Sequence, residues 1–168
     1  MVRDRSGMSK TLLVVPQRCN GCKICLFFCS LKQKASEVDD ARLKVLEAAE
    51  ELGYALPVIC SQCAKAPCEI VCPRKAIIRD RATGALKVDK WDCVQCGLCI
   101  SACPFGMISY TPERKIVKCD LCGGSPICAQ VCPTQAILYT SMEDFTVTKR
   151  KSASRNLKGF SMYVGGEE

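Results

Sequence analysis

The chain has 168 residues, which suits one or two compact domains, and 16 of them are cysteine while none is histidine. The lack of histidine excludes zinc sites of the mixed Cys/His type. The formal net charge of +7 does not indicate a nucleic-acid-binding protein, because cysteines that bind metal do so as thiolates and offset much of this charge.

Apolar segments in the sequence are short. Near the N-terminus only residues 12–15 are continuously apolar before Pro16, whereas a secretory signal needs an apolar core of about 7–15 residues. No stretch approaches the roughly 18 apolar residues of a transmembrane helix. We therefore predict a cytoplasmic protein with no direct membrane insertion, and in that compartment abundant cysteine indicates metal binding rather than disulfide bonds.

The first predicted element is a short strand at residues 10–15, which leads into a quartet of cysteines. The quartet has the spacing C-x2-C-x2-C-x3-C and consists of Cys19, Cys22, Cys25 and Cys29. Ser30 follows it, whereas each of the three later quartets is followed by proline. Because proline normally turns the chain away, we expect the chain to leave this quartet differently, by continuing a helix through residues 26–28.

Residues 30–59 form the longest segment without cysteine between quartets, and they admit two interpretations. Residues 41–52 have a helix-forming composition. Residues 42–46 also alternate like a strand, and residues 54–59 could pair with them as a hairpin. Residue propensity by itself favours the helix.

Two further quartets follow, and hairpin signals surround the second of them. They are Cys60, Cys63, Cys68 and Cys72, followed by Pro73, and Cys93, Cys96, Cys99 and Cys103, followed by Pro104. The first of these has a wider gap between its middle cysteines, and the other repeats the spacing of the opening quartet. Residues 76–78 and 86–89 flank a polar turn and predict one hairpin, and residues 107–110 and 115–118 predict a second.

The last quartet also has a wide gap between its middle cysteines. It consists of Cys119, Cys122, Cys128 and Cys132, followed by Pro133. A strand is predicted at residues 136–139, so a quartet, a proline and a short apolar strand recur three times and indicate a repeated architecture. Residues 143–168 are basic and lack cysteine. They could form a solvated tail, or an arm that docks on a partner subunit through Phe145, Phe160 and Tyr163.

The cysteine spacing indicates iron–sulfur chemistry. A C-x2-C-x2-C-x3-C-P run binds one [4Fe–4S] cluster through its first three thiolates and lends the fourth to a second cluster. The 16 cysteines divide into four quartets with none left over, which predicts four [4Fe–4S] clusters. Each quartet is too compact for a zinc ribbon, in which two cysteine pairs flank a loop of about 12–20 residues. A cluster with its four thiolates carries a net charge of about −2, so four of them would nearly cancel the positive net charge of the chain.

The connections between quartets suggest which of them exchange their fourth cysteine. A single short hairpin within residues 73–92 joins quartets two and three, so these should form one two-cluster half, with quartets one and four as the other. The expected ligand sets are Cys19, Cys22, Cys25 with Cys132; Cys60, Cys63, Cys68 with Cys103; Cys93, Cys96, Cys99 with Cys72; and Cys119, Cys122, Cys128 with Cys29. Pairing one with two and three with four would keep every ligand and exchange only the fourth cysteines, and the longer segment 30–59 does not forbid it.

These motifs, with the Cys-Asp-Leu-Cys-Gly-Gly sequence at residues 119–124, resemble the four-cluster electron-transfer subunits of oxidoreductases. Members include the B subunits of the dimethyl sulfoxide reductase family and the iron–sulfur subunits of formate dehydrogenase, hydrogenase and carbon monoxide dehydrogenase systems. The resemblance covers residues 10–140, and the short form is most similar to small subunits of tungsten-dependent aldehyde oxidoreductases. It implies that quartets one and four share a half, and it favours the hairpin between residues 30 and 59.

The resemblance also implies a fold and its division. We expect an α+β protein with a duplicated, bacterial two-[4Fe–4S] ferredoxin-like fold, in which short hairpins and helices surround four clusters. Residues 1–59 with 111–140 would form one half, residues 60–110 the other, and residues 141–168 a basic C-terminal tail.

The expected function is electron transfer without catalysis. A cluster with four cysteine ligands has no open coordination site, and the sequence contains no G-x-G-x-x-G motif and no catalytic dyad. We predict a subunit that relays electrons between a catalytic subunit, by resemblance a tungsten- or molybdenum-pterin aldehyde oxidoreductase, and a second redox partner such as a flavoprotein or a ferredoxin. The alternatives are a free-standing polyferredoxin, the iron–sulfur subunit of a formate dehydrogenase, hydrogenase or carbon monoxide dehydrogenase complex, and a structural zinc protein.

Overall fold

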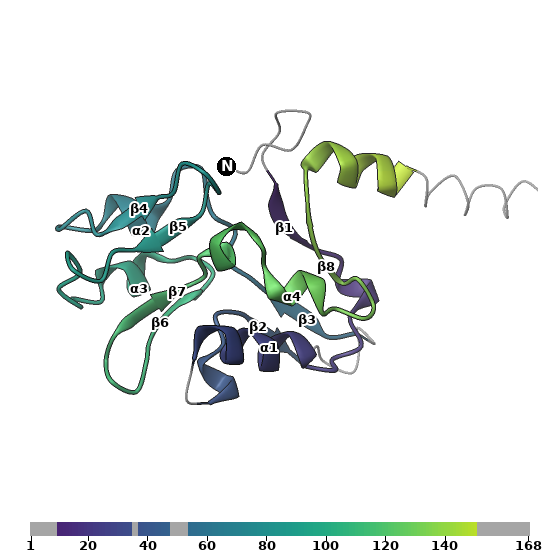
Figure 1. Cartoon of the computed structure of the whole chain (residues 1–168), viewed down its shortest axis with the longest axis horizontal. Coiled ribbons are helices and arrows are strands. Elements are labelled where there is room, and N and C mark those ends of the chain that lie inside the picture. The colour runs from purple at the N-terminus through teal and green to yellow at the C-terminus, as the bar shows by residue number, and fades with distance from the viewer. Residues whose placement is uncertain (1–9, 35–36, 48–53, 151–168) are drawn as a thin grey trace, which may run out of the picture.

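Short antiparallel strand pairs make up the sheet structure of the described residues. These residues are 10–34, 37–47 and 54–150 of a computed structural model of the chain (Figure 1). The pairs are β1 (Thr11–Val14) with β8 (Ile137–Thr140), β2 (Lys44–Leu46) with β3 (Leu56–Val58), β4 (Ile77–Arg79) with β5 (Leu86–Val88), and β6 (Ile108–Tyr110) with β7 (Ile116–Lys118). The last three pairs are local, whereas β1 and β8 join distant parts of the chain, with Leu12 opposite Tyr139.

Each α-helix within the quartets begins one residue before a third cysteine. These helices are α1 (Ile24–Gln33), α2 (Pro67–Ile70), α3 (Leu98–Ala102) and α4 (Ile127–Gln130), and the 3-10 turns are η1 (Pro16–Arg18), η2 (Val38–Asp40) and η3 (Leu121–Gly124). The third cysteine is buried in all four quartets, with between 6% and 8% of its surface exposed. The motif therefore fixes both where a helix starts and which cysteine lies in the interior.

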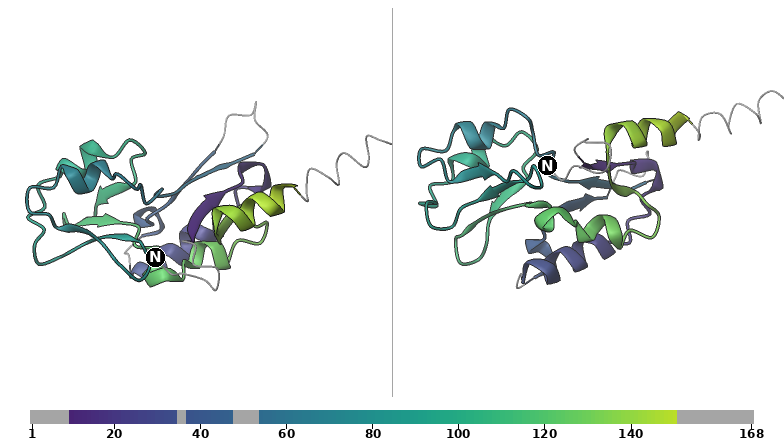
Figure 2. Two further views of the ribbon diagram at one scale, coloured as in Figure 1. Left: turned by 90° about the horizontal axis from the view of Figure 1, so that it is seen from above. Right: turned by 45° about the horizontal axis from the view of Figure 1, so that its top comes forward.

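The elements form two halves, each with its own hydrophobic core. The first half holds β1, α1, β2, β3, α4 and β8, and its core consists of Leu12, Cys25, Leu26, Cys29, Ala41, Leu43, Ala85, Leu121, Cys128 and Ile137. The second half holds α2, α3 and the strands β4 to β7, and its core consists of Ala66, Cys68, Ile77, Leu86, Cys99, Ile108 and Ile116. The second half lies at the left of Figure 1, and the two halves remain side by side in both views of Figure 2.

Most elements lie where the sequence predicts them. The strands expected at residues 10–15 and 136–139 and the hairpins expected within 76–89 and 107–118 are all present, and helices and strands together make the fold α+β. The boundary predicted at residue 110 falls inside the β6–β7 hairpin. Ile116 on β7 packs in the second core, so the second half continues through this hairpin.

Residues 30–59 contain the hairpin rather than the longer helix. Lys44 lies opposite Val58 and Leu46 opposite Leu56, whereas residues 48–53 lie outside the described part of the chain. Leu43, just before β2, is 3% exposed and belongs to the first core. The helix interpretation is therefore wrong for residues 41–47, because strand pairing and burial outweigh the helix propensity of this segment.

The chain leaves the first quartet through a helix, as the absence of proline predicts. Helix α1 continues past Cys29 to Gln33. Ser30 is buried at 5% exposure, and its Oγ donates a hydrogen bond to the carbonyl oxygen of Phe27 at 2.8 Å. This bond satisfies the one side-chain hydroxyl that the helix buries at this point.

Residues 142–150, yellow-green in Figure 1, form a helix after β8. Ser141 caps it: its Oγ accepts a hydrogen bond from the backbone N–H of Asp144 at 3.1 Å and donates one to that residue's carboxylate at 2.7 Å. Phe145 lies on this helix, while the other two predicted anchors, Phe160 and Tyr163, lie outside the described residues. Across the residues that the structure describes, no helix has both the length and the apolar character needed to cross a membrane.

Candidate functional site

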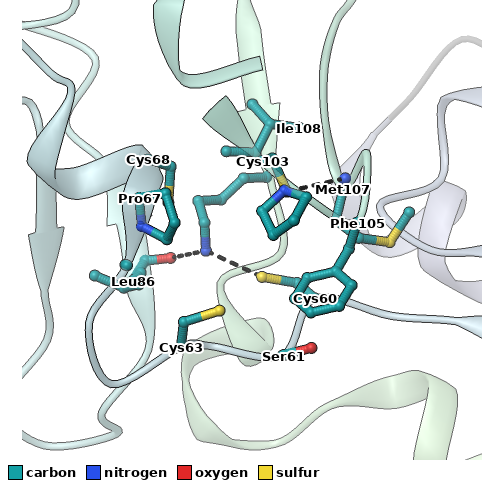
Figure 3. Close-up of a pocket in the computed structure, with 13 residues that line it drawn as sticks. Cys60, Ser61, Cys63, Pro67, Cys68, Leu86, Cys103, Phe105, Met107 and Ile108 are labelled. Carbon is teal, nitrogen blue, oxygen red and sulfur yellow. Dashed lines mark hydrogen bonds between the residues drawn. The ribbon is translucent and has the colours of Figure 1, made fainter. Parts of the chain in front are cut away.

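Three cavities are each lined by four cysteines. The sets are Cys60, Cys63, Cys68 and Cys103; Cys72, Cys93, Cys96 and Cys99; and Cys29, Cys119, Cys122 and Cys128. Each set takes three cysteines from one quartet and the fourth cysteine of another. Figure 3 shows the first of these cavities, with Cys103 next to the cysteines of the second quartet.

The remaining cysteines form a fourth group around Cys25. Burial raises the pKa of the Cys25 thiol to about 11, and the neighbouring Cys132, Cys22 and Cys19 contribute to this increase. Such electrostatic effects weaken with distance, so these cysteines lie in the surroundings of Cys25. Three of the four ligand sets that the sequence suggests thus line cavities, and the fourth set, with Cys132, stays a prediction.

The chain curls between cysteines through residues with positive φ. In the third quartet these are Gln95 at +57° and Gly97 at +81°. A Cβ atom at Gly97 would lie 2.6 Å from the hydroxyl oxygen of Tyr110, so this position requires glycine for space as well as for its backbone angle. The same hydroxyl donates a hydrogen bond to the carbonyl oxygen of Gln95 at 2.8 Å and holds the loop in place.

Backbone N–H groups point at the fourth cysteine of each quartet that ends in proline. The donor is four residues further on: Ala76 to Cys72 at 3.2 Å, Met107 to Cys103 at 3.4 Å and Ala136 to Cys132 at 3.2 Å. Burial raises the pKa of the Cys132 thiol, but hydrogen bonds from the backbone of Ile137, from Thr134 and from the backbone of Ala136 outweigh it, and the net pKa is lowered. These bonds were not predicted from the sequence, although the proline that starts each turn is their signal.

The first quartet has a different donor because it lacks this proline turn. Burial raises the pKa of the Cys29 thiol, and a backbone hydrogen bond from Arg42 partly opposes the increase. Arg42 precedes β2. The segment between quartets one and two therefore supplies the backbone donor to the fourth cysteine, which the turn after proline supplies in the other quartets. The hairpin at residues 44–58 thus completes the surroundings of a cysteine that lies far from it in sequence.

A polar junction between the halves was also not predicted. Gln62 donates a hydrogen bond through Nε2 to the carbonyl oxygen of Cys119 at 2.9 Å, and its Oε1 accepts one from the N–H of Leu86 at 2.9 Å. Lys118 lines the cavity of the second quartet and is 3% exposed. Sequence patterns gave no reason to expect a buried lysine at the end of a strand, where charged residues are usually solvated.

The cysteine groups fit a cluster with several metal atoms. Burial raises the pKa of the Cys99 thiol to about 11 and of the Cys119 thiol to about 12, which disfavours a free thiolate there, whereas a bound metal would stabilise the thiolate. Among the described residues, no three Cys, His, Asp or Glu side chains are grouped closely enough to hold one metal ion. The cysteines instead surround cavities, which is the arrangement that the four corners of a [4Fe–4S] cluster require.

Two cysteines are exposed, and they belong to different halves. They are Cys22 in the first quartet and Cys96 in the third, while every other cysteine is buried or half-buried. Exposed apolar side chains accompany both. Phe27 and Leu31 lie on α1, 49% and 57% exposed, and Trp91 and Val94 flank Cys93, 97% and 60% exposed.

Comparisons with known proteins point to one kind of protein. The family described as "4Fe-4S dicluster domain" matches residues 52–142, which contain quartets two to four. The polyferredoxin-like subunit of aliphatic sulfonate oxidoreductase from Pyrococcus furiosus is 39% identical over 124 residues, which are 72% of this chain and 70% of that protein. The thiosulfate reductase electron transfer subunit PhsB of Salmonella typhi is 33% identical over 148 residues, 79% and 76% of the two chains. An uncharacterized ferredoxin of Methanocaldococcus jannaschii is 32% identical over 142 residues, 84% and 78% of the two chains.

Proposed function

Because this chain belongs to the 4Fe-4S dicluster domain family and carries [4Fe–4S] clusters, we propose that it is a four-cluster electron-transfer subunit of an oxidoreductase complex. Relatives named as subunits of aliphatic sulfonate oxidoreductase and thiosulfate reductase support a role in a complex. The clusters supply one-electron carriers with no open coordination site, and the protein supplies the path between partners. The ligands of the four clusters are the four cysteine groups described above.

The observation that carries this proposal is the continuity of the cysteine groups. Cys128, in the fourth quartet's group, lies in the same hydrophobic core as Cys25 of the first. The Nζ of Lys118 donates both to the carbonyl oxygen of Cys119, in the fourth quartet, and to the Sγ of Cys60, in the second. Cys68 of the second quartet and Cys99 of the third share the other core. Neighbouring groups thus run in the order one, four, two, three.

The two ends of this order carry the exposed cysteines Cys22 and Cys96. Electrons would enter at one end and leave at the other, with a partner bound over each exposed apolar surface. The catalytic partner is a tungsten- or molybdenum-pterin oxidoreductase, and a flavoprotein or a ferredoxin is the second partner. A free-standing polyferredoxin is the second candidate, favoured by the likeness to a ferredoxin from Methanocaldococcus jannaschii.

The cluster number is tested by anaerobic purification. We expect about 16 iron and 16 inorganic sulfide per chain, with the EPR signals of reduced [4Fe–4S] clusters after dithionite treatment. A colourless protein that binds zinc, or one that binds half this amount of iron, would contradict the four-cluster proposal.

The partner is tested by native co-purification with a tagged chain. A complex subunit should retain a larger protein that contains tungsten or molybdenum, measured by elemental analysis of the complex. A chain that elutes alone at the size of a monomer, while still accepting electrons from several enzymes, would favour the free polyferredoxin.

A further inference from the structure

A lysine ammonium lies against one cysteine sulfur inside the protein. Lys118, at the end of β7, is 3% exposed, and its Nζ donates to the Sγ of Cys60 at 3.4 Å. It also donates to the carbonyl oxygen of Leu86 at 2.9 Å, that of Cys119 at 3.2 Å and the Oε1 of Gln62 at 3.3 Å. The bonds that end on Cys60 and Leu86 are drawn as dashed lines in Figure 3. The ammonium is therefore fixed in the wall of the cavity.

This charge has no carboxylate partner within the described structure. The ion pairs that its residues form are Lys23–Glu47, Arg42–Asp120 and Lys87–Asp80. The acceptors around Lys118 are two carbonyl groups, an amide and a thiol. Burying an ammonium without an opposite charge is costly, so its counter-charge must come from what the cavity binds. A cluster with its four thiolates, at about −2, supplies that charge.

The cations that line the other two cavities are either paired with a carboxylate or exposed to solvent. Arg42 lines the cavity of Cys29, Cys119 and their partners, but its guanidinium is 3.1 Å from the carboxylate of Asp120, which cancels most of its charge. Arg74 lines the cavity of the third quartet and is exposed, so water and salt screen it. Among the described cationic residues that line the three cavities, Lys118 is thus the one both buried and free of a carboxylate.

We propose that Lys118 is the built-in counter-charge of the cluster at Cys60, Cys63, Cys68 and Cys103, and that it gives this cluster the highest reduction potential of the three whose cavities are outlined. The proposal rests on the ligand sets of the proposed function. Reduction adds one electron, from a neighbouring cluster or a partner, and makes the cluster with its thiolates more negative by one charge. A fixed ammonium at the sulfur stabilises this added charge, because the surrounding protein has a lower dielectric constant than water.

The position of the lysine gives this effect a role in the path. Lys118 precedes Cys119 in the chain and touches Cys60, so it lies where the groups of quartets four and two meet. Because this cluster has a raised reduction potential, an electron that arrives from the fourth quartet's cluster is more stable on the second quartet's cluster. Lys118 therefore acts as a positioning residue for charge, not as a ligand.

The test compares Lys118→Met with Lys115→Met in the full chain, after both have been loaded with clusters anaerobically. Lys115 lies on the same hairpin but is exposed, so its variant makes the same charge change in a screened place. In EPR-monitored redox titrations, the Lys118→Met change should lower the reduced-to-oxidised ratio of one cluster at least about tenfold at fixed potential, a shift of about 59 mV for one electron. The cluster that shifts should be the one missing from a Cys103→Ala variant. Lys118→Arg keeps the positive charge, so its cluster should retain most of the wild-type reduction potential.

A second variant guards against loss of folding. Gln62→Glu keeps the lysine and places a carboxylate 3.3 Å from its Nζ, so it should lower the same potential while Lys118 stays in place. Equal shifts in the Lys118→Met and Lys115→Met proteins, or an unchanged potential in both Lys118→Met and Gln62→Glu, would overturn the inference. Those outcomes leave the cluster number intact, whereas a wild-type chain without about 16 iron atoms would overturn the proposed function instead.

Discussion

The two halves surround their cysteines with different backbone structures. In the second half both quartets end in proline, and a turn brings an N–H group to the sulfur of Cys72 and of Cys103. In the first half only the fourth quartet does so, at Cys132. The first quartet instead extends helix α1 past Cys29, and Arg42 supplies the backbone hydrogen bond. A donor to the sulfur is thus found in every quartet, although the segment that supplies it differs.

The halves also differ in how the chain closes them. The second half is one continuous segment, from the second quartet to β7, and its hairpins are local. The first half joins β1 to β8 across most of the sequence, with Val14 opposite Ile137. Long-range closure costs more chain entropy than a local hairpin, so the first half depends more on whatever ties its two segments together. The exchanged cysteines Cys29 and Cys132 would provide that tie.

Removing an exchanged cysteine should have the largest effect on cluster content and stability, and it should reveal the difference between the halves most clearly. Cys103→Ala in the second half and Cys132→Ala in the first should each cost one cluster, about four iron atoms per chain. The Cys132→Ala protein should also unfold at a lower temperature than the Cys103→Ala protein, because it loses a connection between distant segments. Iron analysis, EPR and anaerobic thermal unfolding measure both effects.

Ser101→Ala, an exposed change on α3, is the control for these cysteine variants and should retain all of its iron. If Cys103→Ala removed the EPR signal of the fourth quartet's cluster rather than that of the second, the proposed ligand sets would be wrong. Equal stability of the two cysteine variants would contradict the argument from chain closure.

Exchanging the residues that follow the fourth cysteine tests the backbone difference directly. Ser30→Pro puts proline in the interior of α1, where its ring would meet the carbonyl of Leu26, and should lower the free energy of unfolding by about 3 kcal/mol or more. The reverse change, Pro104→Ser, should cost only about 0.4–1 kcal/mol, mostly through the unfolded chain. Denaturant unfolding of the cluster-loaded proteins compares them. A Ser30→Pro protein as stable as the wild type would show that the helix is not required there.

Local signals predicted most elements of both halves. The strands and hairpins of the second half were visible because short apolar runs alternate with turns, and the same reading placed β1 and β8. Ser30, in place of proline after Cys29, predicted that a helix would carry the chain out of the first quartet, although not that α1 would reach Gln33. The β2–β3 hairpin was left open, since residues 42–46 alternate like a strand but the segment also has helix propensity, and the burial of Leu43 in the first core becomes visible only in the structure.

What the sequence did not predict depends on contacts between distant residues. The pairing of β1 with β8 joins segments with no shared local signal. The burial of Lys118 follows from its place between Leu86 and Cys60, which lie on other segments. The N–H donors at Cys72, Cys103 and Cys132 were accessible in principle, because proline at a fixed place implies a turn, but their target could be identified only from the geometry.

The smallest expected effect comes from removing the carboxylate partner of Arg42, so that this cation of the first half is unpaired like Lys118 in the second. Asp120 accepts the N–H of Cys122 through Oδ1 at 3.0 Å and pairs with Arg42 through Oδ2 at 3.1 Å. Asp120→Asn keeps an oxygen for that N–H and removes the charge, so Arg42 would face the cavity of Cys29, Cys119, Cys122 and Cys128 uncompensated.

The potential of the cluster in that cavity should then rise, by less than the roughly 59 mV expected at Lys118, because the Arg42 and Asp120 side chains are 17% and 35% exposed and partly screened. EPR-monitored titration measures the change, and Glu113→Gln, exposed in the β6–β7 turn, is the control. A fall in potential, or a rise larger than the shift caused by Lys118→Met, would contradict this argument. It would show that burial and ion pairing do not determine how strongly each cation affects the reduction potential of its cluster.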